Sequence, residues 1–110
     1  MRQIVIDELS PMETDNIDSY LKRTLQKGPM IGLYWLIIPP EQLGEAQQGH
    51  EECGPFYTAV EMGKDLVKFE LLVRSHTNLH CTCIAYASQS QRNFVLDFID
   101  SMLDEEMVKA

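Results

Sequence analysis

The sequence contains few basic residues. Nine lysines and arginines stand against 17 aspartates and glutamates, so the formal net charge is −8 at pH 7. Phosphate backbones and anionic lipid headgroups repel an acidic chain within a Debye length. We therefore expect this protein to bind neither nucleic acid nor a membrane surface.

Long apolar runs are also missing. No stretch approaches 18 consecutive apolar residues, and the amino terminus reaches Asp7 and Glu8 before a segment long enough for a signal peptide has formed. These features predict a cytoplasmic protein. A chain of 110 residues can bury one hydrophobic core, so we expect residues 1–110 to form a single domain.

Cysteine is scarce and catalytic motifs are missing. Three cysteines are an odd number, which argues against a disulfide framework of the secreted type. No glycine-rich loop precedes a helix as a phosphate site would need, because Gly28 and Pro29 follow a predicted helix instead. Ser75 and His76 are adjacent, but a catalytic triad is defined by spatial geometry. An interaction protein is therefore favoured over an enzyme.

Two amphipathic helices are predicted from capping signals and apolar periodicity. The first begins after Ser10, with Pro11 at its first position and Glu13 completing a capping box, and a start near Thr14 remains an alternative. A second capping box begins at Ser88. The helix that follows it should present one apolar face, made of Phe94, Val95, Phe98, Ile99, Met102 and Leu103.

The remaining chain has the pattern of strands separated by turns and one long loop. A short strand precedes the first helix, and residues 39–55 lack apolar periodicity, which predicts a long loop. Four more strands are expected at about residues 30–38, 56–62, 65–74 and 79–87. The order β-α-β-β-β-β-α predicts an α+β two-layer sandwich, with a mainly antiparallel sheet and both helices on one face.

Strand alternation then sorts side chains between the two faces of the sheet. In the last expected strand it directs Cys81 and Cys83 toward the helices, where free cysteine behaves as a small apolar residue. The opposite, outer face should combine aromatic and aliphatic residues with charge, which is typical of an interface. The residues that we expect to form this interface are Tyr34, Tyr57, Leu72, Arg74, Ile84 and Tyr86.

This outer face leads to the favoured functional prediction. A face with so many apolar side chains should not remain in water over its whole width, so we expect a partner protein or a homodimer. The alternative is that the amino terminus or the long loop folds over the face.

A metal-dependent or thiol-dependent site is the alternative function. A meander brings the long loop and the neighbouring strand ends to one end of the sheet, which holds His50, Cys53, His76, His80 and Cys81. His50 and Cys53, completed by His76 or His80, are the ligands that we expect there. Imidazole and thiolate suit zinc, so zinc is the cofactor that these residues would hold, although we expect none to be required. Glu51 and Glu52 directly precede Cys53 and should raise the pKa of its thiol.

Overall fold

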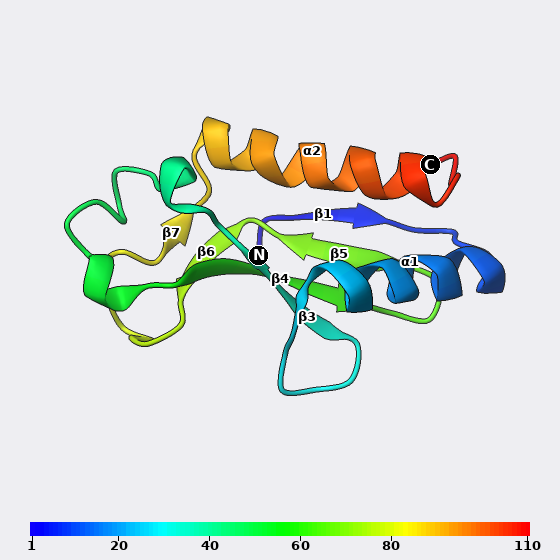
Figure 1. The fold of residues 1–110 in the computed structure, drawn as a ribbon, viewed down its shortest axis with the longest axis horizontal. Helices are drawn as coiled ribbons and strands as arrows, with labels where there is room; N and C mark the ends of the chain where they lie inside the picture. Colours follow the sequence, from blue (N-terminus) through cyan, green and yellow to red (C-terminus); the bar gives the residue numbers. More distant parts are fainter.

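The computed structural model describes all residues, 1–110, and contains two helices and seven strands. Figure 1 shows their arrangement along the chain. Two single-turn 3₁₀ helices, η1 (Pro40–Gln42) and η2 (Glu51–Cys53), lie in the long loop. The other elements are β1 (Gln3–Ile6), α1 (Pro11–Thr24), β2 (Gln26–Lys27), β3 (Leu33–Ile37), β4 (Phe56–Met62), β5 (Val67–Glu70), β6 (Leu72–Ser75), β7 (Ala85–Tyr86) and α2 (Gln89–Glu105).

Strand β4 is the centre of the antiparallel sheet. One edge of β4 pairs with β3, while its other edge pairs with β5 along one half and with β6 along the other. Leu71 separates β5 from β6: its N–H donates to the carbonyl of Arg2, and its carbonyl accepts from the N–H of Ala87. The strands β1 and β7 therefore follow one another along the same side of β5 and β6.

Both helices cover the same face of the sheet, as predicted. Capping boxes at Ser10 and Ser88 begin α1 and α2, which satisfies backbone N–H groups that a helix start leaves without partners. The larger hydrophobic cluster lies between these helices and the sheet. Its fully buried side chains include Ile17 and Leu21 from α1, Val60 and Phe69 from the sheet, and Val95 and Met102 from α2.

The α+β sandwich predicted from the sequence is confirmed, but the last expected strand is wrong for most of its length. Only Ala85 and Tyr86 are in a strand, and residues 76–84 form consecutive turns. The Ser75 hydroxyl accepts from the N–H of Asn78, the Asn78 side chain accepts from the N–H of His80, and Ile84 N–H donates to the carbonyl of Cys81. These local bonds compete successfully with strand pairing.

The register of β3 also differs from the expectation. Tyr34 pairs with Val60 and is 2% exposed, and its hydroxyl donates to Asp18 of α1 at 2.6 Å. The predicted position of Tyr34 on the outer face is therefore wrong. The reason is that a continuous apolar run carries no alternation, so the sequence alone does not distinguish its two faces.

The pairing of β1 determines where the amino-terminal segment lies. Strand β1 pairs with β5, so this segment extends the sheet, and the side chain of Arg2 before it lies over the Tyr86 ring. Neither helix has the length and apolar character that a membrane crossing would need.

Candidate metal centre

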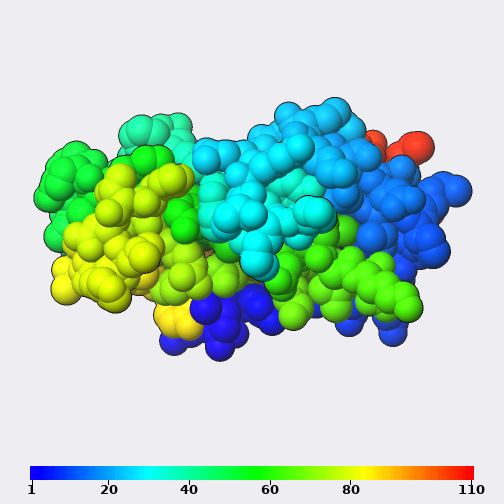
Figure 2. All heavy atoms as spheres, turned by 90° about the horizontal axis from the view of Figure 1, so that it is seen from below, coloured from blue at the N-terminus to red at the C-terminus, as the bar shows by residue number.

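The long loop and the turns that follow β6 meet at one end of the sheet. In Figure 2 these two segments lie against each other at the left of the molecule, residues 50–58 in green and residues 75–84 in yellow. Ser75 Oγ donates to the carbonyl of Cys53, and Thr77 Oγ1 donates to the carbonyl of Glu52 at 3.1 Å. Side chains of the second segment therefore hold the backbone of the first.

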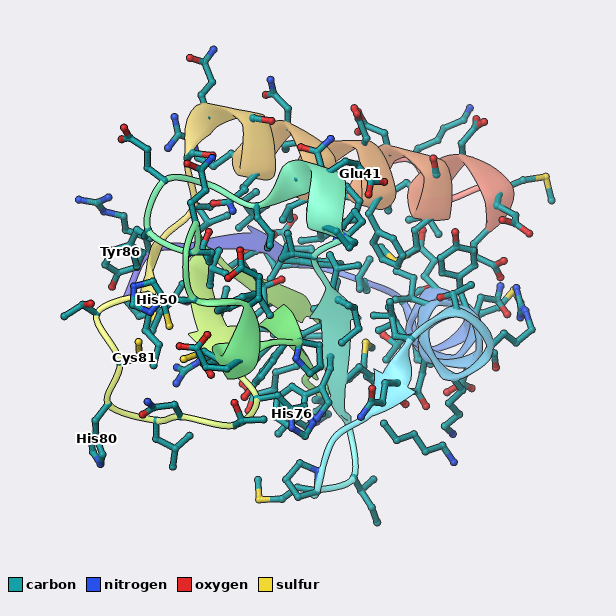
Figure 3. All side chains as sticks on the ribbon, turned by 60° about the vertical axis from the view of Figure 1, so that its left-hand side comes forward. Glu41, His50, His76, His80, Cys81 and Tyr86 are labelled. Atoms are coloured by element: carbon teal, nitrogen blue, oxygen red, sulfur yellow. The ribbon has the colours of Figure 1, made fainter.

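Four ligand-type side chains converge at this contact. His50 and Cys53 come from the long loop, Cys81 and Cys83 come from the turns, and their ligand atoms all lie within 4.8 Å of one another. Cys81 Sγ is 3.7 Å from Cys53 Sγ and 3.2 Å from His50 Nδ1. Figure 3 shows the His50 ring and Cys81 side by side.

The two separations from Cys81 Sγ agree with the ligand spacing of a tetrahedral zinc centre. Zn–S bonds of about 2.3 Å at tetrahedral angles place two sulfur atoms about 3.8 Å apart, and a nitrogen ligand lies about 3.5 Å from a sulfur. The observed 3.7 Å and 3.2 Å distances are close to both values. Three thiols and one imidazole are also a common ligand set of structural zinc sites.

The turn at residues 81–84 explains how a Cys-x-Cys pair can contribute two ligands to one point. In an extended strand, alternate side chains lie on one face and run parallel to each other, so they do not point toward a single ion. Here the chain reverses after Cys81, and the N–H of Cys83 donates to the Sγ of Cys81 at 3.4 Å. The reversal brings both sulfurs to the same side of the loop.

A buried chain of two amides holds the cysteine turn against the long loop and α2. Gln47 is 1% exposed and donates from Nε2 to the carbonyl of Cys83 at 2.7 Å. Its Oε1 accepts from the N–H of Gly44 at 2.9 Å and from Gln91 Nε2 at 2.9 Å. Both polar atoms of the Gln47 side chain therefore have partners. Gln91 Nε2 also donates to the carbonyl of Gln42.

The three thiols have different acidities. Hydrogen bonds from the Cys83 thiol and from the Cys83 N–H lower the pKa of Cys81 to about 7. Burial, assisted by the neighbouring thiols, raises the pKa of Cys83 to about 12. Burial also raises the pKa of Cys53; Glu52 contributes in the direction predicted from the sequence but is a minor cause. Without metal, Cys81 is therefore the cysteine that forms a thiolate, and it lies beside the protonated thiols of Cys53 and Cys83.

Two of the four residues predicted from the sequence as ligands lie outside this cluster. His80 is exposed and points away from the protein in Figure 3. The His76 ring packs edge-on against Tyr57, with ring centroids 5.9 Å apart, and its backbone N–H donates to the carbonyl of Pro55. The structure brings together His50 and Cys53 and adds Cys81 and Cys83, which the expected strand had assigned to the core alone.

Burial of the cysteines also differs from the simple expectation. Cys53 lies in the predicted long loop but is only 4% exposed, whereas Cys83 is completely buried, in agreement with its predicted core position. Cys81 is partly exposed. A signal for this site was present in the sequence, because a His-x-x-Cys pair and a Cys-x-Cys pair lie on either side of a hairpin. Its interpretation required knowing that the second pair lies in a turn.

The other predicted interface residues are distributed as follows. Cross-strand pairing places Tyr57 beside Arg74 and Leu72 beside Tyr86, so all four lie on the outer face. Ile84 instead lies in the cysteine turn and packs against the second hydrophobic cluster.

Comparison with known proteins gives no relative for this chain: no family model, no curated protein and no solved structure matches it.

The Gln47 bridge can be tested by truncation. Gln47→Ala removes the hydrogen-bond partner of the Cys83 carbonyl and of the Gly44 N–H, and one of the two acceptors of Gln91 Nε2. We therefore expect it to lower the free energy of unfolding by about 1–3 kcal/mol per buried group left without a partner. Gln48→Ala is the matched control because Gln48 is exposed next to it. Urea denaturation of both variants measures the difference, and equal midpoints would contradict a stabilising role for the bridge.

Proposed function

We propose that this protein is a zinc-binding protein in which His50, Cys53, Cys81 and Cys83 hold one Zn²⁺ ion. The observation that supports this proposal is the convergence of four zinc-type ligand atoms within 4.8 Å, from two segments about 30 residues apart in the chain. Four protein ligands complete a tetrahedron and leave no position for a substrate. The proposed ion is therefore structural.

The burial of the ligands supports the same proposal. Cys53 and Cys83 belong to a hydrophobic cluster with Ile38, Phe56 and Val73, so the ligand set is rigidly supported on one side. A zinc ion there would join the long loop, which has little regular structure, to the turns after β6. Its binding free energy would add directly to the stability of this end of the fold.

Metal content and single substitutions test this proposal. We expect about one zinc per chain in protein purified without a histidine tag, measured by elemental analysis. Cys81→Ser, Cys83→Ser and His50→Ala should each weaken zinc binding about a hundredfold or more, because each removes a direct ligand. His76→Ala and His80→Ala are the matched controls, since both histidines lie in the same region outside the cluster.

Equal loss of zinc in the ligand variants and in the His76 and His80 controls would contradict the assignment of ligands. Wild-type protein that contains no zinc, and whose unfolding midpoint does not rise when zinc is added, would contradict the proposal as a whole.

Zinc binding should strengthen with pH. Each thiol must lose its proton to bind, and the pKa of Cys81 is lowered to about 7, whereas the pKa values of Cys53 and Cys83 are raised. Near pH 8, binding should therefore displace about two protons from thiols, and the zinc association constant should rise about a hundredfold per pH unit. Below pH 7 the dependence should become steeper, because Cys81 is then also protonated.

Calorimetric titration of zinc in buffers of different ionisation enthalpy counts these protons. Release of one proton or fewer per zinc near pH 8 would show that Cys53 or Cys83 does not bind as a thiolate.

Self-association through the outer sheet face is a second candidate function. Both helices lie on the opposite face, and Figure 2 shows the side turned away from α2. Tyr86 and Val5 are each 40% exposed on this side. The face also carries Lys68 beside Glu61, and Arg74 joined to Glu70 by two bonds of 3.0 and 3.2 Å. Balanced charge here reduces repulsion between two acidic copies.

A substitution at Tyr86 tests this second candidate. If Tyr86 and Leu72 lie in a symmetric contact, Tyr86→Glu removes the ring from both copies and brings two carboxylates together across the contact, which should convert a dimer to a monomer. Leu96→Glu is the matched control, because Leu96 is 42% exposed on α2. Sedimentation velocity at high micromolar concentration measures the mass, and a wild-type monomer would contradict this candidate.

A further inference from the structure

We infer that the metal centre is sensitive to peroxide, which converts Cys53 and Cys81 to a disulfide and releases the zinc ion. This inference rests on the zinc site proposed above and concerns its regulation. Three features of the described residues support it: the exposure of one sulfur, the position of a second sulfur beside it, and the attachment of the remaining ligands.

Cys81 is the sulfur that an oxidant in solution reaches. Cys53 is 4% exposed and Cys83 is completely buried, whereas Cys81 is partly exposed. Its neighbours His80 and Thr82 are both exposed, so Cys81 lies in the most exposed segment of the ligand set. Access to the sulfur controls which cysteine of a set is oxidised first.

Cys53 is positioned to react next. Its Sγ lies 3.7 Å from that of Cys81, and a disulfide bond of about 2.05 Å requires an approach of less than about 2 Å. Cys83 is a poorer partner because a Cys-x-Cys disulfide closes a small, strained ring. Cys83 is also held by the bond from Gln47 to its carbonyl, so its backbone resists the required movement.

The chemistry balances with hydrogen peroxide as the named oxidant. The Cys81 thiolate attacks one peroxide oxygen, an S–O bond forms as the O–O bond breaks, and the departing hydroxide takes a proton to become water. The Cys53 sulfur then attacks the sulfenic acid of Cys81, forming the S–S bond and releasing a second water. In total, two zinc-bound thiolates lose two electrons, and one peroxide is reduced to two waters with two protons taken from solvent. One S–S bond replaces the two Zn–S bonds. His50 and Cys83 then remain as a two-ligand set, too few to retain zinc.

Oxidation of the zinc-loaded protein tests the inference. The protein is first loaded with zinc and freed of excess metal, and then treated with one equivalent of hydrogen peroxide while a chromogenic chelator reports the free zinc. We expect about one zinc released per disulfide formed, a disulfide between Cys53 and Cys81 in the peptide map, and recovery of zinc binding after dithiothreitol.

Variants in the metal-free protein identify the role of each cysteine. Cys81→Ser should slow the consumption of peroxide at least about tenfold, because only buried sulfurs remain. Cys83→Ser is the matched control and should still form the bond between Cys53 and Cys81. In Cys53→Ser the sulfenic acid at Cys81 should persist and be trapped by dimedone. Circular dichroism verifies that each variant is folded, and the map of the wild-type protein does not depend on any variant.

The two proposals fail in different ways. A chain that does not bind zinc fails at the loading step, before peroxide is added, and overturns the zinc function and this inference together. Zinc retained after oxidation, or a map dominated by a bond between Cys81 and Cys83 or between two chains, overturns the inference while the zinc function stands.

Discussion

The buried hydrogen bonds of Gln47 are the constraint on which the candidate site depends. They connect three parts of the chain that local structure does not connect: the long loop, the start of α2 through Gln91, and the cysteine turn through the carbonyl of Cys83. The long loop has no apolar periodicity that could dock it on the core. A fully satisfied polar network in a low-dielectric interior can define a single arrangement where apolar packing alone would allow several.

The second hydrophobic cluster and the metal centre share residues. The cluster contains six buried side chains, against 13 in the cluster between the helices and the sheet, and two of the six are Cys53 and Cys83. A small core contributes little stability by burial alone. A metal ion bound by the sulfurs of the same cluster would strengthen the end of the fold where apolar burial is weakest, and oxidation would remove that support.

The two faces of the sheet are suited to different tasks. The face covered by α1 and α2 is buried in the hydrophobic core, with Val60 and Phe69 fully buried. The outer face retains Trp35 and Tyr57 in contact, with ring centroids 4.3 Å apart, and the Arg2 guanidinium over the Tyr86 ring at 4.6 Å. The proposed metal centre lies at the end of the sheet, so zinc binding and self-association through the outer face use different residues.

The sequence by itself determined the elements that depend on local signals. Capping boxes at Ser10 and Ser88 and apolar periodicity defined both helices, because caps and periodicity act over a few residues. The class of the fold followed from the order of these elements.

Tertiary structure decided the ligand set and the face of Tyr34. The segment 79–87 has the composition of a strand, but most of it is held in turns. Backbone N–H groups donate to the side chains of Ser75 and Asn78, and Gln47 donates to the carbonyl of Cys83. Only in that conformation do Cys81 and Cys83 meet His50 and Cys53. Convergence of side chains more than 25 residues apart depends on non-local contacts, and the spacing of residues along a chain does not specify such contacts.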